Sequence, residues 1–381
     1  MKILIQSIVL PHYRIPFFNK LIEKNCYDLS VVYSPYGNKN QNSTGIEHSQ
    51  IQKDFKENKA GLIRINLLNL KFYYQKGLLR AIKVFNPDVY ITQTNQFEIS
   101  SILALLYCKY KKIPIVFWTK GYADTSKRNY FIDNFIMKPM LSLGDIYLPY
   151  GNSTIEYLVS LGIHKDRIIT SFNTVDVERI SNNLMNYKKI GQHLLAEQKI
   201  EESSFIISTV GRLVSKKNVI QLCFSIKKLV DKGYSVIGLI GGYGPEENNI
   251  RDVVEKLNLE DSVLLLGKLP NDHDNVLLAI SDLAVFCGAN GLAILQAMAL
   301  KVPVLIADET GADSEVVRHL NTGIRFEKNN INEIVYWIEK VINNEINITK
   351  IVADAEKEVL GKRNLDKYVS AMSYAIQKVY N

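Results

Sequence analysis

The sequence predicts an α/β protein with two Rossmann-like domains, each built on a doubly wound parallel sheet. Short apolar runs rich in β-branched residues alternate with helix-length amphipathic stretches along the chain. The strand-like runs are almost continuously apolar, which is typical of parallel strands covered on both faces. The alternation stops once, at the polar stretch 181–204. A chain of 381 residues is long enough for two domains with separate cores.

The first half of the chain carries the first series of predicted elements. Strands are expected at 2–10, 27–34, 62–67, 88–93, 113–118, 145–150 and 167–172. Helices are expected at 15–24, 74–85, 100–110, 130–143 and 153–161. Tyr73 and Tyr74 fall at the start of the second of these helices, where we expect them to pack rather than to bind a sugar. This series predicts a first domain at residues 1–185.

The second half repeats the pattern. Strands are expected at 205–211, 234–242, 262–267, 282–288 and 302–307. Helices are expected at 219–232, 246–257, 292–300, 314–319, 331–341 and 368–379. We place a second domain at 186–360 and a final helical segment at 361–381. Ligands of such sheets bind beyond the carboxyl ends of the strands, so two such domains are expected to face each other across a cleft.

Several classes of protein are excluded by composition and motifs. The four cysteines, at positions 26, 108, 223 and 287, lack the paired spacing of a zinc ribbon or a disulfide framework. No apolar run approaches the roughly 20 residues that cross a bilayer, and the first run is too short for a signal peptide. There is no phosphate-binding P-loop, no GxSxG elbow and no visible pair of catalytic carboxylates. We expect a cytoplasmic protein without a metal site.

Positive charge is concentrated in the first half of the chain. Residues 1–185 hold 23 Lys and Arg against 14 Asp and Glu, whereas residues 186–381 hold 23 against 25. A basic half suits an anionic partner such as a membrane surface, a phosphorylated substrate or nucleic acid. Solvated lysines with no partner are equally consistent with this count.

Two loops of the second half have the chemistry of phosphate sites. In VGRLVSKKN (210–218), Arg212 and Lys217 lie between a strand end and a helix start, where cations and backbone N–H groups favour a diphosphate. In FCGANGLAILQ (286–296), Gly291 and Leu292 precede a helix and offer a second set of N–H groups. The glycines of LIGGYGPEE (239–247) lack dinucleotide spacing, so a tight structural turn is expected there.

The order and spacing of several segments resemble the donor-binding half of retaining GT-B glycosyltransferases of family 4. These segments are GRLVSKKN (211–218), GGYGPEE (241–247), VLLLGKLPNDHDNVLLAISDLAVF (263–286), GLAILQAMALKVPVL (291–305) and ADSEVVRHLNTG (312–323). In the first half, YRIPFFNKL (13–21), FWTKG (117–121) and SFNTVD (171–176) stand where that family has acceptor-domain landmarks. The resemblance implies a GT-B fold whose last helix returns to the first domain.

The resemblance also implies residue roles. Arg212 and Lys217 would hold the donor diphosphate and stabilise the charge that builds on it as the glycosidic bond breaks. A nucleotide sugar, with UDP favoured over GDP, would be the donor and no further cofactor is implied. The donor-binding residues implied by the resemblance are Gly211, Arg212, Lys217, Gly242, Gly267, Lys268, Leu269, Gly291, Leu292 and Gln296. Lys120 would lie near the reacting centre, and His12, Asp124 and Arg128 are candidates for acceptor contacts.

Three positions depart from the family pattern. The family usually has two glutamates eight positions apart, where this chain has Gly288 and Gln296. Gln296 can still accept hydrogen bonds from ribose hydroxyls, although an amide is a weaker acceptor than a carboxylate. Gly288 has no side chain, which either opens room for a different sugar or marks lost activity. Lys120 stands where a histidine is common, and it cannot accept a proton while protonated.

The resemblance predicts a retaining, metal-independent glycosyltransferase of surface polysaccharide assembly. It would act on a lipid-linked glycan at the inner face of a membrane, without a nucleic-acid partner. The alternative is a degenerate protein of the same fold that binds a glycan or a partner glycosyltransferase without turnover. The retained Arg212 and Lys217 favour the enzyme.

Overall fold

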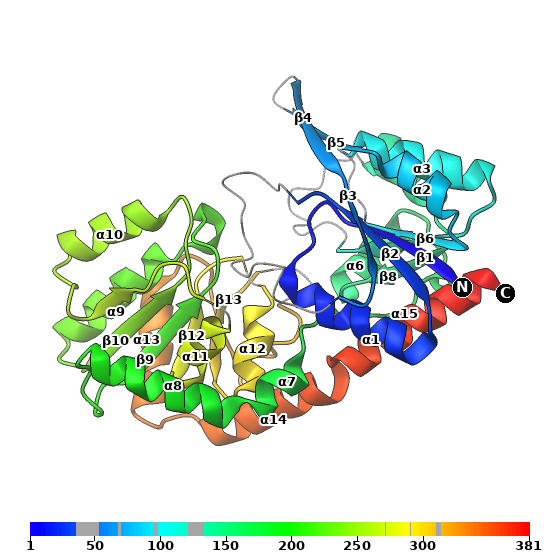
Figure 1. Ribbon diagram of the computed structural model, residues 1–381. Coiled ribbons are helices and arrows are strands. Elements are labelled where there is room, and N and C mark those ends of the chain that lie inside the picture. Colours follow the sequence, from blue (N-terminus) through cyan, green and yellow to red (C-terminus); the bar gives the residue numbers. More distant parts are fainter. Residues whose placement is uncertain are drawn as a thin grey trace. The chain divides into compact units, whose positions relative to one another are not determined.

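The computed structural model describes residues 1–35, 53–67, 70–93, 98–120, 133–270, 272–289, 291–309 and 314–381. These residues form two compact units (Figure 1). The first unit combines the described residues up to Asn173 with the segment Leu365–Asn381, and the second contains the described residues between Thr174 and Asn364. Among the described residues, no helix combines the length and the apolarity needed to cross a bilayer.

The first unit is built on a six-stranded parallel sheet. Its strands, in spatial order, are β3 (Lys56–Lys59), β2 (Asp28–Tyr33), β1 (Lys2–Gln6), β6 (Val89–Thr92), β7 (Ile115–Thr119) and β8 (Ile146–Pro149). Ile3 pairs in register with Leu29 on one side and with Val89 on the other. A separate antiparallel hairpin is formed by β4 (Gly61–Leu67) and β5 (Leu70–Lys76).

Helices cover both faces of this sheet. They are α1 (Ile15–Asn25), α2 (Leu78–Phe85), α3 (Ile99–Tyr110), α5 (Lys138–Ser142), α6 (Asn152–Ser160) and α15 (Leu365–Tyr380). Because side chains alternate along a strand, Ile3 and Ile5 join one core with α1 and α15, whereas Leu4 joins the other with α2 and α3. The near-continuous apolar runs of the sequence reflect this burial on both sides.

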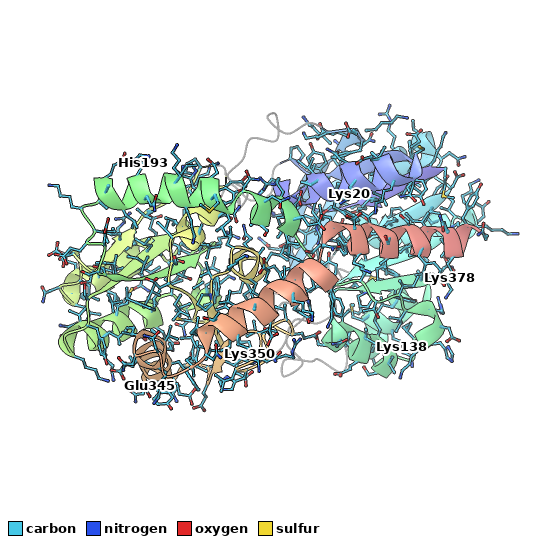
Figure 2. The ribbon with its side chains drawn as sticks, turned by 90° about the horizontal axis from the view of Figure 1, so that it is seen from below. Lys20, Lys138, His193, Glu345, Lys350 and Lys378 are labelled. Atoms are coloured by element: carbon cyan, nitrogen blue, oxygen red, sulfur yellow. The ribbon has the colours of Figure 1, made fainter. Side chains whose placement is uncertain are left out.

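The last helix, α15, is part of the first unit. Figure 2 shows it beside α1, which carries the labelled Lys20. Lys20 Nζ donates to Asp366 at 2.6 Å, and Asn25 Nδ2 donates to Ser373 Oγ at 2.9 Å. The ring of Tyr368 packs 4.7 Å, centroid to centroid, from Phe17. The helix therefore completes a core that the first 173 residues begin.

The second unit has a sheet of the same topology. Its strands, in spatial order, are β11 (Val263–Leu265), β10 (Val236–Gly241), β9 (Phe205–Val210), β12 (Leu283–Phe286), β13 (Val304–Ala307) and β14 (Ile324–Phe326). All neighbours are parallel. When the strands of each parallel sheet are numbered one to six along the chain, both sheets have the spatial order 3-2-1-4-5-6. This is the Rossmann order. The predicted α/β class with two parallel sheets is confirmed.

The helices of the second unit lie around this sheet. They are α7 (Val177–Asn182), α8 (Leu184–Glu197), α9 (Ile220–Asp231), α10 (Glu247–Lys256), α11 (His273–Ala279), α12 (Ala293–Ala299), α13 (Ile331–Ile342) and α14 (Ile348–Lys362). The polar stretch 181–204 is thus mostly helix. Gly191 allows α8 to pack closely on the end of α11, since a Cβ there would lie 2.2 Å from Ile280. This packing places α8 in the second unit. The boundary between the two units therefore lies between residues 173 and 174, whereas the sequence predicted it after residue 185.

Four predicted elements differ from the structure. Residues 62–67 lie in the antiparallel hairpin, and residues 74–85 divide between β5 and α2, so Tyr73 and Tyr74 lie in a strand. Residues 167–172 form a single bridge, between Tyr147 and Ile168, instead of a strand. Residues 314–316 form a turn, and His319 forms an isolated bridge with Gly323, so the helix expected at 314–319 is absent. The edge strand β3 (KENK) was not predicted, since its charged side chains lack a strand pattern.

Candidate functional site

Glycines bring the ends of β9 and β10 into close contact in the second unit. Gly211 and Gly242, directly after these strands, have φ values of 134° and 141°, which favour glycine. A Cβ on Gly242 would lie 1.7 Å from the carbonyl oxygen of Gly211. The Gly211 N–H donates to Gly241 at 2.9 Å, and the Gly242 N–H donates to Gly267 at 2.8 Å. Backbone hydrogen bonds therefore join the carboxyl ends of β9 and β10 and the residues after β11.

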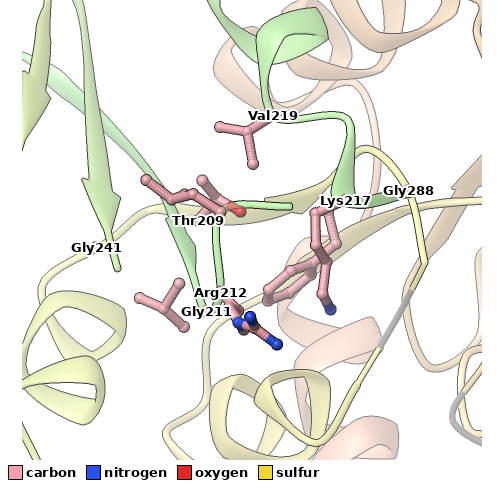
Figure 3. Close-up of a pocket in the computed structure, with 10 residues that line it drawn as sticks. Thr209, Gly211, Arg212, Lys217, Val219, Gly241 and Gly288 are labelled. Atoms are coloured by element: carbon pink, nitrogen blue, oxygen red, sulfur yellow. The ribbon is translucent and has the colours of Figure 1, made fainter. Parts of the chain in front are cut away.

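A pocket opens at these strand ends and contains both predicted phosphate-binding cations. It is narrow, with a cavity volume of about 10 Å³, and its lining includes Thr209, Gly211, Arg212, Lys217, Gly241 and Gly288. Arg212 follows β9 directly, and Lys217 ends the 3-10 turn Ser215–Lys217. Figure 3 shows the charged ends of Arg212 and Lys217 at the same end of the pocket. Both side chains are half-buried.

The loop before α12 lies against the same lysine. A Cβ on Gly291 would be 3.3 Å from Lys217 Nζ. Leu292 is the residue that immediately precedes α12. The two loops that the sequence suggested as anion sites facing each other thus meet at the ammonium group of Lys217.

The space beside the Cα atom of Gly288 is filled by neighbouring backbone. A Cβ there would lie 2.3 Å from the carbonyl oxygen of Lys216 and 2.7 Å from the carbonyl carbon of Lys217. The N–H of Ala289 donates to that same Lys216 oxygen at 2.8 Å. The missing side chain at position 288 therefore lets the Ser215–Lys217 turn approach β12, and it does not create room for a larger sugar at that point.

Replacing Gly288 by alanine is expected to displace this turn. Overpacking against backbone typically costs about 1–3 kcal/mol, so we expect a loss of that size in the free energy of unfolding, measured by chemical denaturation. Gly361→Ala on α14 is the matched control, because a Cβ there meets nothing within 4 Å and alanine favours a helix. Equal stability of the Gly288 variant and the wild type would contradict the contact.

The predicted donor-binding residues Gly267, Lys268 and Leu269 lie beside the end of β10. Gly267 has a φ of 64° and accepts from the Gly242 N–H. Lys268 Nζ lies 5.8 Å from the centroid of the Tyr243 ring. Leu269 packs against the strand end, since a Cβ on Gly241 would lie 2.5 Å from its Cδ1 atom.

Gln296 does not line the pocket and is engaged within the unit. Its Nε2 donates to Asp274 Oδ2 at 2.7 Å and to Asn275 Oδ1 at 3.0 Å, joining α12 to α11. A glutamate at position 296 would lose both donors and face the Asp274 carboxylate. The family-like residue is therefore disfavoured here by the neighbouring helix.

We expect Gln296→Glu to destabilise the protein at neutral pH. The neighbouring carboxylate raises the pKa of the introduced glutamate above its unfolded value, so stability is lost as the pH rises through and above that unfolded value. The expected loss at pH 8 is about 1–3 kcal/mol, with a smaller loss at pH 4. Adding Asp274→Asn should restore stability, whereas Gln198→Glu at an exposed position should change little. A loss that is independent of pH would contradict the assigned cause.

The remaining predicted residues belong to the first unit. Lys120 is exposed directly after β7, and its carbonyl accepts from Thr154 Oγ1 at 2.7 Å. His12 lies in a 3-10 turn after β1, half-buried, with its ring edge-on to that of Tyr13. Asp124 and Arg128 lie outside the described residues.

A buried polar network at the end of β1 was missed by sequence reasoning. Gln6 Nε2 donates to Glu98 at 2.5 Å and to Gln75 at 2.8 Å, and Thr92 Oγ1 donates to Gln6 Oε1 at 2.8 Å. These residues lie where β1 meets β6, the point at which strand order reverses in the first unit. Burial raises the pKa of Glu98 to about 7. The only signal in the sequence was a polar residue ending an apolar strand, because positions 6, 75 and 98 share no spacing.

Glu98→Gln is expected to remove a pH dependence of stability. The folded pKa of Glu98 exceeds its unfolded value, so its contribution is present at low pH and is lost as the pH rises from about 4.5 to above 7. That change amounts to about 3 kcal/mol. Unfolding measured at pH 5 and pH 8 should show a wild-type loss that the variant lacks. The exposed Glu202→Gln control should retain the loss, and a variant that behaves as the wild type would contradict the assignment.

A second missed feature is the buried guanidinium of Arg14 in the first unit. It lies 4.1 Å from the Trp118 ring centroid and donates to Tyr368 Oη at 2.7 Å, Tyr150 Oη at 3.1 Å and Asn173 Oδ1 at 2.8 Å. Burial by itself lowers the pKa of Arg14, but the interactions with the nearby tyrosines, above all Tyr368, raise that pKa overall. Arg14 therefore joins β7, the end of β8 and α15 to the start of α1.

Comparisons with known proteins agree with this architecture. Residues 192–358 match the family model described as Glycosyl transferases group 1. A capsular polysaccharide biosynthesis glycosyltransferase of Staphylococcus aureus, CapM, is 31% identical over 196 residues, which is 48% of this chain and 50% of that protein. The matches span about half to three fifths of the length of such curated relatives.

Solved structures match over almost the whole chain. A glycosyltransferase from Rickettsia africae has a TM-score of 0.78 at 16% identity, covering 99% of this chain and 98% of that one. Alr3699/HepE of Anabaena, in complex with UDP and glucose, has a TM-score of 0.73 at 15% identity, covering 99% and 100%. Likeness at this level of identity defines the fold, and the predicted GT-B fold is confirmed. Within it, the segment 192–358 carries the match to a glycosyltransferase family.

Proposed function

We propose that this protein is a retaining, metal-independent glycosyltransferase. It transfers a sugar from a nucleotide diphosphate donor to a lipid-linked glycan during surface polysaccharide assembly. The pocket that brings Arg212 and Lys217 together at the end of β9 is the observation that carries this proposal. The family match and the polysaccharide role in the name of CapM support the same reaction class.

The proposed chemistry depends on charge. As the bond between the anomeric carbon and the diphosphate breaks, negative charge builds on the leaving group, and two fixed cations stabilise it more strongly than the ground state. The leaving diphosphate accepts the proton of the acceptor hydroxyl on the same face of the sugar, so no separate nucleophile is needed. The close approach of Gly291 to Lys217 gives the diphosphate backbone N–H groups as well as cations.

Calorimetry with UDP, GDP and UMP tests the donor site. We expect UDP to bind more tightly than GDP, and the diphosphate to bind more tightly than UMP, because the cations contact the second phosphate. Mass spectrometry of nucleotide sugars incubated with the protein, with and without EDTA, tests turnover and its independence of metal. Failure to bind any nucleotide together with no hydrolysis would overturn the proposal and favour a binding protein without turnover.

A further inference from the structure

The outer side of α3 is apolar although it faces water. Ile99, Leu103, Leu106 and Tyr110 are spaced by four, three and four residues, so they form one stripe along the helix. All four are exposed, Leu103 at 41%, Leu106 at 52% and Tyr110 at 79%. The opposite side, with Leu105 among its residues, is fully buried in the core. A helix that is apolar on both sides normally has a partner on both sides.

The neighbouring helix extends this surface and adds positive charge. Figure 1 shows α2 beside α3, and the two helices are in contact. Val84 of α2 is 77% exposed, and Arg80 and Lys83 are exposed beside it. Lys111 and Lys112 are exposed directly after α3. We call these residues and the α3 stripe the α2–α3 face.

The stretch of sequence that contains this face is strongly basic. Residues 58–123 hold ten of the 46 Lys and Arg and two of the 39 Asp and Glu, a net charge of +8, so the rest of the chain carries −1. The two acids of this stretch, Asp88 and Glu98, do not neutralise the cations of the face. Glu98 is buried, and Asp88 accepts from the backbone N–H of Lys2 at 2.7 Å.

We propose that the α2–α3 face docks this protein on the surface of an anionic lipid membrane. The apolar stripe would enter the region between headgroups and acyl chains, and the four cations would contact anionic headgroups. Tyr110 combines an apolar ring with a hydroxyl, which suits this boundary. With 12 residues α3 is about 18 Å long, so it would lie in the plane of the membrane and could not cross it.

The charge pattern favours a membrane over a second copy of the chain. In a symmetric dimer the same face would meet itself. Arg80, Lys83, Lys111 and Lys112 would then approach their own counterparts, and Asp145, the carboxylate that contacts α3, already pairs with Lys109 at 2.7 Å. Like charges would therefore meet, which is unfavourable. An anionic bilayer offers complementary charge and an apolar layer to the same surface.

Vesicle flotation of the full chain tests the proposal. The probes are neutral phosphatidylcholine vesicles and vesicles with about a third phosphatidylglycerol, at low salt and at high salt. We expect the protein to float with the anionic vesicles and to be released at least severalfold by high salt, because surface charge attraction is screened. Leu103→Ser/Leu106→Ser and, separately, Lys111→Glu/Lys112→Glu should each lower the bound fraction at least fivefold.

Matched controls come from α8 in the second unit. Met185 is 77% exposed, and Lys188 and Lys189 are an exposed pair. Met185→Ser and Lys188→Glu/Lys189→Glu should float as the wild type does. Thermal unfolding followed by circular dichroism should show that the variants of the face, which lie in the first unit, stay folded. UDP calorimetry on the same variants should give wild-type affinity, so that loss of folding and failure of the donor site are both distinguished from loss of docking.

Three results would overturn the proposal. One is equal flotation with neutral and anionic vesicles. Another is wild-type binding by both variants of the face. The third is a dimer, seen by analytical ultracentrifugation, that Leu106→Ser dissociates, since the face would then bind a second copy. The proposal shares with the proposed function only the membrane setting, and UDP binding without flotation would refute docking while leaving the donor site intact.

Discussion

Arg212→Met is expected to lower kcat/KM for nucleotide-sugar turnover by about 10²–10³-fold, the usual effect of removing one group that stabilises developing charge. Arg212 lines the pocket directly after β9. Methionine fills a similar volume without charge or hydrogen-bond donors, so the fold should survive. UDP affinity measured by calorimetry should fall as well, because the same group holds the ground-state diphosphate. Lys217→Met should act in the same direction.

Lys216→Met provides the matched control for this prediction. Lys216 belongs to the same turn but is exposed and does not line the pocket. Its carbonyl, which holds Ala289, is unchanged by the substitution. Wild-type kinetics in the Arg212 variant, or an equal loss in the Lys216 variant, would remove the assignment of Arg212 to the leaving group.

Arg14→Met is expected to lower the free energy of unfolding by about 4 kcal/mol. Hydrogen bonds to a buried charged group contribute about 1.5–3 kcal/mol each, and a desolvated cation over an indole adds about 2 kcal/mol. The cost of burying the guanidinium offsets part of this sum. Because Tyr150 and Asn173 lose a donor inside the core, methionine cannot compensate by volume alone. Denaturant unfolding gives the value.

Two further variants define the cause of this loss. Arg14→Lys keeps the charge but cannot donate in three directions from one plane, so we expect an intermediate loss. Arg80→Met, at an exposed position on α2, should leave stability unchanged. Hydrogen exchange should be faster in α15 of the Arg14→Met variant, since Tyr368 is one of its partners. Unaltered exchange in α15 would contradict the role of Arg14 in holding that helix.

Patterns of neighbouring residues in the sequence predicted the strands and loops whose structure depends mainly on those same residues. The apolar runs identified ten of the parallel strands because burial on both faces leaves a continuous signal. The loops around Gly211 and Gly291 were identified because a cation or glycine between strand and helix has a defined chemistry. The close approach of Gly291 to Lys217 follows from the order of β9 and β12 in the sheet, which is a property of the fold.

Features that depend on contacts distant in sequence were not predictable. The partners of Arg14 come from positions 118, 150, 173 and 368, and no spacing in one sequence connects them. Gly288 was interpreted as a lost side chain, whereas the structure shows backbone packed against it. Gln296 was interpreted by comparison with a family glutamate, and its preference for an amide depends on Asp274 of another helix.

The position of α15 has a consequence for how the chain is made. The core around Trp118 and Phe17 receives its last layer from residues 365–381, almost two hundred positions after the rest of that unit. During translation the second unit can therefore finish folding while the first still exposes apolar surface. A nonsense codon or a proteolytic cut that removed only these final residues would damage the amino-terminal unit and spare the segment next to the break.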